Sequence, residues 1–385
     1  MQGARAAFWD KAVLLFVTDF TKIIWEIDRK VMRTNNQDRS IRNTYLDIVK
    51  YFTIFCVIWG HVVQQTCLLK NPNIDYIYRF IYTFHMPLFM GICGYFFAKS
   101  INKSGRQKYI QKKLKIRLLG LIIPMLSFGA LKIIIVGKFG VLSYLRMVHD
   151  VWFLGDVAIN TLLIIFVLKW CNNKFWHDIK FFMLIFPLAC IPKLGYGSHG
   201  GFMYLFFVGG YCLAKYYKKD FQKYCNYGKY FLGVFVVSFL LFDYMFYETS
   251  GFMLSIKEPI GMIVAGTLKI ILGVTGCYLM LLTIYKIVPF FSNSQLEYRA
   301  IEQGRFTLDI YLLNIIILEM IGGPLYRKLV NLYDFNLFYE YGLMFEVIST
   351  FIGACIMMEI IIFIGKMMNK NRYIAKVFFY RDINQ

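Results

Sequence analysis

The chain is divided into apolar runs of about twenty residues by short charged stretches. About twenty helical residues, at 1.5 Å each, cross the roughly 30 Å of hydrocarbon in a bilayer, so this spacing is typical of membrane-spanning helices. Hydrophobic residues make up 58% of the 385-residue chain and charged residues only 17%, which leaves too little polar surface for a soluble enzyme. The sequence therefore predicts an all-α, polytopic membrane protein.

Ten candidate spans follow one another along the chain. Two of them, the fifth and the sixth, are shorter than a usual span, so they are either re-entrant or extended by flanking residues. The predicted spans cover residues 45–66, 79–98, 116–136, 153–168, 180–192, 201–214, 230–247, 260–285, 306–323 and 343–365.

The distribution of basic residues gives the predicted orientation. A formal charge of +20 would suggest nucleic acid as the partner of a soluble chain. The positions of the basic residues along the sequence decide between nucleic acid and a membrane as the partner. Of the 43 Lys and Arg residues, 33 lie in the terminal segments and in every second loop, against 8 in the other loops. Because Lys and Arg accumulate on the cytoplasmic side, both termini are predicted to be cytoplasmic, and the partner is a bilayer and not nucleic acid.

Three regions are expected along the chain. Residues 1–41 form a cytoplasmic segment, in which residues 8–27 have the pattern of an amphipathic helix lying in the interface and are not followed by a signal-peptide cleavage site. Residues 42–370 form the membrane domain and residues 371–385 a cytoplasmic tail. Six of the nine cysteines lie inside apolar runs and no CxxC pair occurs, so we interpret them as reduced packing residues and expect no metal site.

The first span has a polar stripe along one face. Lys50 and His61 are eleven residues apart, which places them about 20° apart around the helix and about 16 Å apart along it, and Asp47 and Gln65 lie within about 60° of them. Ionisable groups are costly within a membrane and usually face a cavity or a partner. For Asp47 and Lys50, an interfacial anchor is an equally good explanation; for His61 the alternative is a structural histidine.

The second span brings another histidine to the same depth. It runs in the opposite direction, and His85 is about 9 Å from its outer end, the level that His61 reaches from the inner side. A near-neutral imidazole can take a proton from a hydroxyl and return it, which is the work of a general base in acyl transfer. Pro87 frees backbone carbonyls nearby, which is useful in a site but also typical of a simple kink.

The same segments resemble the acyltransferase 3 family of bacterial integral membrane proteins, and within it the fucose 4-O-acetylase-like branch. The resemblance is carried by Lys50 with His61 eleven residues later, by Phe-His85-Met-Pro-Leu-Phe, by Gly94-Tyr-Phe, and by two later motifs, Trp152-Phe-Leu and Leu308-Asp-Ile-Tyr-Leu-Leu. It covers residues 42–370. It implies a cytoplasmic acyl-coenzyme A donor, usually acetyl, and a hydroxyl acceptor on a glycan or glycolipid.

The sequence departs from the family pattern in two places. Asn314 stands where many relatives carry a third histidine, and the Arg-X2-Arg of the second inner loop is replaced by a looser basic cluster, Lys112, Lys113, Lys115 and Arg117. This cluster, in a loop with eight basic and no acidic residues, could bind the phosphates of coenzyme A. Positive-inside topology and anionic lipid would also produce such a loop.

Several further residues within the spans are candidates for the site. Asp156, which follows the Trp152 motif, could line an acceptor entrance with Trp152, and an ion pair with Lys132 is the simpler explanation. The run Gly195–Gly201 lacks the ending of a phosphate-binding loop and is interpreted as a flexible turn. The other ionisable residues within spans are Asp243, Lys269, Asp309, Glu319 and Glu359.

These observations lead to an O-acetyltransferase of the bacterial cytoplasmic membrane. Its co-substrate is acetyl-coenzyme A, its acceptor a sugar hydroxyl of a cell-surface polysaccharide or lipid-linked glycan. His61 is the expected general base, Lys50 the coenzyme-binding residue, and His85 the residue that orients the acceptor or shares the proton. Asp47, Trp152 and Asp156 are expected to bind the substrate. The competing hypothesis is a transporter that uses its buried ionisable residues as a proton relay; coenzyme dependence distinguishes the two.

Overall fold

The computed structural model describes residues 44–66, 76–190, 200–216, 227–246, 259–325, 328 and 342–381. The amphipathic helix predicted at residues 8–27 and most of the glycine-rich run lie outside these residues. Within the described residues, every regular element is a helix. The elements in chain order are α2 (Thr44–Thr66), α3 (Tyr76–Ser104), α4 (Arg106–Tyr109), η2 (Ile110–Leu114), α5 (Lys115–Val136), α6 (Val141–His149), α7 (Trp152–Val167), η3 (Leu168–Trp170), α8 (Phe175–Cys190), α9 (Gly200–Tyr216), α10 (Gly228–Phe246), α11 (Pro259–Ile287), η5 (Val288–Phe291), α12 (Gln295–Gly304), α13 (Thr307–Asn314), η6 (Ile315–Gly322), α16 (Gly342–Lys370) and α17 (Arg372–Phe379).

Each of the ten predicted spans corresponds to one of these helices. Seven helical segments in the described part of the chain are long and apolar enough to cross a membrane. They are α2, α3, the run from α4 to α5, α7 with η3, α11 with η5, α13 with η6, and α16. The remaining three are not among these seven: α8, α9 and α10 have 16, 17 and 19 residues, and residues Gly228–Phe242 of α10 form a shorter apolar helix. The protein is therefore an all-α, multi-pass membrane protein; the count of ten spans and the side of the termini stay predictions.

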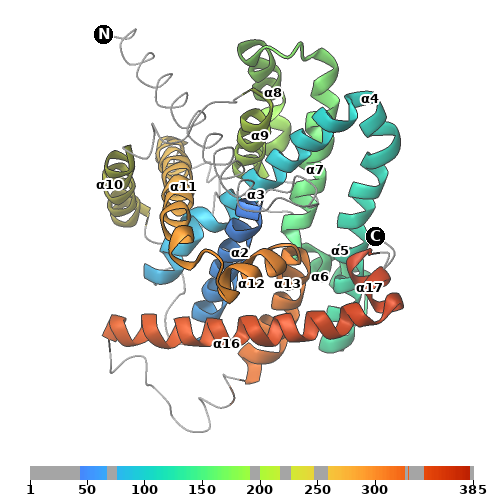
Figure 1. Ribbon diagram of the computed structural model, residues 1–385, viewed down its shortest axis with the longest axis vertical. Helices are drawn as coiled ribbons and strands as arrows, with labels where there is room; N and C mark the ends of the chain where they lie inside the picture. The colour runs from blue at the N-terminus through green and yellow to red at the C-terminus, as the bar shows by residue number, and fades with distance from the viewer. Residues whose placement is uncertain are drawn as a thin grey trace.

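Helix α2 packs along the consecutive elements α13 and η6, which run in the same direction as α2. The elements are drawn in Figure 1. At one end, a methyl group added to Gly304 would collide with the carbonyl of Asp47, and near the other end one added to Gly323 would collide with the side chain of Gln65. These partners are 257 and 258 positions apart, so the two segments keep almost the same register along their length. Each level of α2 can therefore be matched to a level of α13 and η6.

Helices α3 and α9 form a second close pair in the interior. A side chain at Gly94 would collide with the carbonyl of Phe207, and one at Gly210 would collide with the carbonyl of Gly91. Glycine is required at these positions because the two backbones are in contact. This pair holds α3, with its histidine, between α2 and α9.

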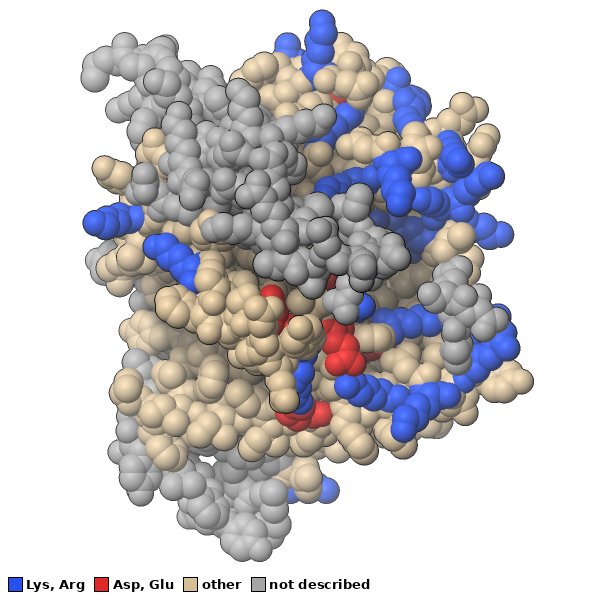
Figure 2. All heavy atoms as spheres, in the orientation of Figure 1, with Lys and Arg blue, Asp and Glu red and all other residues tan. Residues whose placement is uncertain are grey.

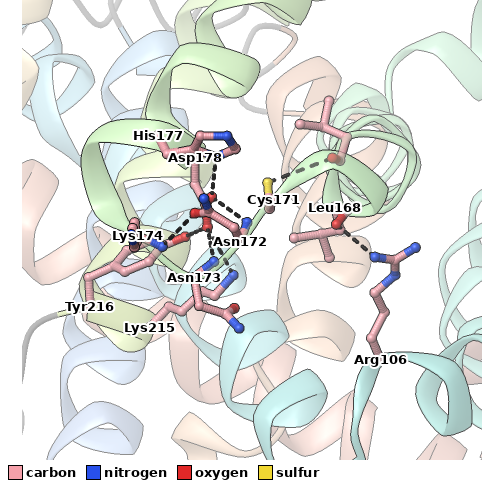
Figure 3. A network of polar contacts seen from close by, with 11 residues as sticks. Arg106, Leu168, Cys171, Asn172, Asn173, Lys174, His177, Asp178, Lys215 and Tyr216 are labelled. Carbon is pink, nitrogen blue, oxygen red and sulfur yellow. Dashed lines mark hydrogen bonds and ion pairs between the residues drawn. The ribbon is translucent and has the colours of Figure 1, made fainter.

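A polar network ties the predicted cytoplasmic ends of α7, α8 and α9 together (Figure 3). The buried carboxylate of Asp178 accepts hydrogen bonds from the backbone amides of Asn172, at 2.8 Å, and Asn173, at 3.0 Å, and from the hydroxyl of Tyr216. The ammonium group of Lys215 lies 3.5 Å from the same carboxylate. Burial alone would raise the pKa of Asp178, but the hydrogen bonds and the nearby charge hold that pKa below its ordinary value.

The C-terminal helix α17 packs on α5. Its Phe378 and Phe379 rings contact Phe128 of α5. Arg381, two residues after the end of α17, pairs with the buried Asp309 at the start of α13, with 2.8 Å between nitrogen and oxygen. The C-terminal segment and the start of α13 were both predicted to be cytoplasmic, so this ion pair agrees with the predicted topology.

Candidate active site

A cavity of about 240 Å³ lies between α2, α3, α5, α7 and α13. Its walls are mostly apolar, and two cationic side chains, Lys50 and Arg117, line it. The remaining lining residues are Ile54, Met86, Phe89, Ile92, Cys93, Phe96, Leu121, Phe153, Leu154, Val157, Thr307, Leu308 and Tyr311. An apolar chamber with two fixed cations suits a long, flexible ligand that carries negative charge at one end.

Lys50 is held at the cavity by its partner on the same helix. Its ammonium nitrogen lies 2.6 Å from Oδ1 of Asp47 and 5.5 Å from the ring centre of Phe96. Asp47 is buried, and its second oxygen lies 3.9 Å from Nε of Arg305. Asp47, predicted to bind substrate, thus orients Lys50 and is not among the residues that line the cavity.

Arg117 is the one member of the predicted basic cluster that lines the cavity. Its guanidinium donates to the carbonyl of Cys93, at 3.4 Å, and lies over the ring of Phe97. The other members of the cluster, Lys112, Lys113 and Lys115, are exposed on η2 and the first turn of α5.

The exposed lysines belong to a basic surface. Figure 2 shows Lys and Arg side chains gathered on the side of the molecule where α4 and α5 lie in Figure 1. Helix α4 is fixed there because the guanidinium of Arg106 donates to the carbonyl of Leu168, at 2.7 Å (Figure 3). The cationic surface and the cavity with its two cations are therefore joined through α5, which carries Arg117 two residues after Lys115.

His61 lies beyond the cavity on α2, seven residues after Ile54, and faces a carboxylate. Its Nδ1 is 3.2 Å from Oε1 of Glu319 on η6, an ion-pair distance without the alignment of a hydrogen bond. A carboxylate at that position favours the tautomer with its proton on Nδ1, which leaves Nε2 as the free base. The side chains of His61 and Glu319 are 15% and 30% exposed, so the pair is only partly buried.

His85 is buried on α3, and the ring of Tyr82, one turn before it, reaches Gly60, the residue that precedes His61 on α2. Its Nδ1 lies 2.7 Å from the carbonyl of Ile81, so this nitrogen carries the proton and Nε2 is again the acceptor. The ring packs edge-on against Tyr82, with 4.5 Å between ring centres. The structure thus brings the two predicted histidines into one cluster.

The Trp152 motif lies at the same cavity. Phe153 and Leu154, at the start of α7, line it, and the Phe153 ring contacts Tyr311 with 5.7 Å between ring centres. The side chain of Trp152 is partly buried, and that of Asp156 is buried one turn further along α7. The ammonium group of Lys132 pairs with the carboxylate of Asp150, in the segment just before α7.

The acyltransferase 3 family model, which describes an acyltransferase domain, matches residues 43–367. The chain belongs to the acyltransferase 3 family. It is also similar to nodulation protein NolL of Sinorhizobium fredii, with 28% identity over 190 residues, which cover 45% of this chain and 49% of that protein. The chain spans about half the length of this curated relative. No solved structure matches the chain.

Family membership confirms the resemblance seen in the sequence at the level of the family. The protein is a multi-pass membrane protein that contains an acyltransferase domain. The narrower resemblance to the fucose 4-O-acetylase-like branch stays a prediction. Among the residues that the structure describes, no three His, Cys, Asp or Glu side chains gather into a metal-binding group.

Sequence reasoning found Glu319 only as one of several ionisable residues within spans. Its pairing with His61 joins positions 258 apart, and no local pattern predicts such a contact. The one available signal is the polar character of both residues in apolar spans that are predicted to run in the same direction.

Proposed function

We propose that the protein transfers an acetyl group from cytoplasmic acetyl-coenzyme A to a sugar hydroxyl of a cell-surface polysaccharide or lipid-linked glycan. Its expected location is the bacterial cytoplasmic membrane. The observation that carries this proposal is the arrangement along α2, where a cavity with two fixed cations lies two turns from a histidine paired with a carboxylate.

The donor end of the site fits coenzyme A as a co-substrate. Its phosphates suit the exposed lysines of η2 and α5, because clustered ammonium groups bind phosphate through charge-assisted hydrogen bonds. Its uncharged arm and the thioester suit the apolar walls of the cavity, where Lys50 and Arg117 can donate to amide carbonyls.

The proton passes through His61. Its Nε2 takes the proton of the acceptor hydroxyl as the oxygen attacks the thioester carbonyl, and then gives that proton to the departing sulfur. The products are an ester on the sugar and a free thiol. Glu319 stabilises the imidazolium that exists between the two transfers, and His85 orients the acceptor through its free Nε2.

The test is the release of free thiol from acetyl-coenzyme A by the purified protein in detergent, supplied with glycolipids of the host. We expect thiol release by the wild type, and its loss in His61→Ala at an unchanged melting temperature. A folded wild type that consumes no coenzyme in the presence of its glycan would contradict the proposal and favour a transporter, which moves its substrate unchanged.

A further inference from the structure

Asn314, the last residue of α13, is a buried amide whose polar atoms are both unused. Its side chain is 0% exposed, and neither Oδ1 nor Nδ2 has a hydrogen-bond partner among the described residues. Buried amides are nearly always hydrogen-bonded, because leaving a buried donor or acceptor unpaired destabilises the fold. A residue that costs stability in this way is typical of a functional site.

The position of Asn314 connects the two parts of the site. On α13, Thr307, Tyr311 and Asn314 lie within about 60° of one another around the helix, and the first two line the cavity. Asn314 lies about 4.5 Å beyond Tyr311 along the axis and about 7 Å before the level of Glu319. The register between α2 and α13 places Asn314 opposite Cys56 and Val57, between Ile54 at the cavity and His61.

The change of helix type after Asn314 brings Glu319 to the same side. Residues five apart in an α-helix point about 140° away from each other. Residues 315–322 form the π-helix η6, whose hydrogen bonds join residues five apart, so that such residues lie nearly one above the other. Asn314 and Glu319 therefore share a face, which they would not do in a continuous α-helix, and Glu319 contacts His61 on that face.

We propose that Asn314 supplies an oxyanion-stabilising hydrogen bond, donated from Nδ2 to the carbonyl oxygen of the acyl group. An acyl group that passes from the cavity to His61 crosses the level of Asn314, whose buried amide has no hydrogen-bond partner among the described residues. The carbonyl oxygen becomes negative when the hydroxyl attacks, and a fixed donor in an apolar setting stabilises that charge most strongly. This inference rests on the proposed function.

The experiment compares the wild type with Asn314→Leu, which keeps the volume and removes the amide, and Asn314→Asp, which replaces the donor by an acceptor. We expect kcat for thiol release to fall about 100- to 1000-fold in both variants, the usual effect of losing one oxyanion donor, while KM for acetyl-coenzyme A changes less than about threefold. The melting temperature of Asn314→Leu should equal or exceed that of the wild type, because an unpaired buried amide has been removed.

The matched control is Thr161→Val on α7, which removes another buried polar group whose hydroxyl bonds only to its own helix, at the carbonyl of Val157. Its kcat should stay at the wild-type value. If kcat of Asn314→Leu stays within threefold of the wild-type value, the role assigned to Asn314 is wrong, but the proposed function stands. The same conclusion follows if kcat falls only together with the melting temperature. A wild type that consumes no acetyl-coenzyme A would overturn the proposed function, and this inference with it.

Discussion

Replacing Glu319 by glutamine removes the charge that faces His61 and keeps the size of the side chain. In the proposed reaction this charge has its largest effect while the imidazole is protonated, between the two proton transfers. The substitution should therefore slow the chemical step and leave the binding of acetyl-coenzyme A unchanged.

The distance between the two groups sets the size of the effect. Opposite unit charges 3.2 Å apart interact by about 5 kcal/mol at an effective dielectric constant of 20, and by about 1.3 kcal/mol at the dielectric constant of water. The side chain of Glu319 is 30% exposed, so an intermediate value of about 2–4 kcal/mol is appropriate. That range corresponds to a fall in kcat of roughly 30- to 1000-fold.

The assay is steady-state release of thiol at saturating glycolipid acceptor, with kcat and KM determined separately. Glu319→Asp, which keeps the charge, should recover part of the lost kcat. The control is Glu359→Gln on α16, because Glu359 pairs with Arg299 at an exposed position and should leave kcat unchanged. A Glu319→Gln protein with wild-type kcat would refute the role assigned to the carboxylate.

Two further predictions concern the donor site and the polar network. Lys50→Met and Arg117→Met should each raise KM for acetyl-coenzyme A about tenfold, equivalent to one lost charge-assisted hydrogen bond, whereas Lys138→Gln, at an exposed position after the opposite end of α5, should change KM less than about threefold; equal effects in all three would contradict a binding role for the cavity. Asp178→Asn should be about 1–3 kcal/mol less stable than the wild type at neutral pH. Because the pKa of Asp178 is lowered in the fold, its contribution is present above the ordinary value of 3.8 and is lost as the pH falls through the folded pKa. Melting temperatures of the two proteins should thus converge below pH 4, and a difference that does not depend on pH would contradict this reasoning.

Much of the fold follows from the sequence, because hydrocarbon leaves a backbone little choice except a helix. The third predicted span, 116–136, and the helix α5, Lys115–Val136, agree within one residue. The helices α6, α12 and α17 were not predicted, since short helices between or after the spans have no comparable length requirement. The two π-helices depend on packing that a single sequence does not reveal.

The site was predictable where its members lie on one helix or on neighbours in sequence. The eleven-residue spacing predicted that Lys50 and His61 lie on one face of the first span. Counting residues from the opposite side of the bilayer predicted that His85 lies at the same depth as His61. The pairing of His61 with Glu319 and the exclusion of three lysines from the cavity required the structure. Asn314 was visible only as a departure from a family motif, and its burial without a partner came from the packing of α13.

The most direct test of the central claim follows the acetyl group itself. Acetyl-coenzyme A labelled in its acetyl group is incubated with wild type or His61→Ala protein in membranes that contain the host glycans, and the glycan fraction is then treated with mild alkali. The account predicts label in the glycan with the wild type, released by alkali as acetate, and none with His61→Ala. Label transferred equally by a correctly inserted His61→Ala protein would contradict it.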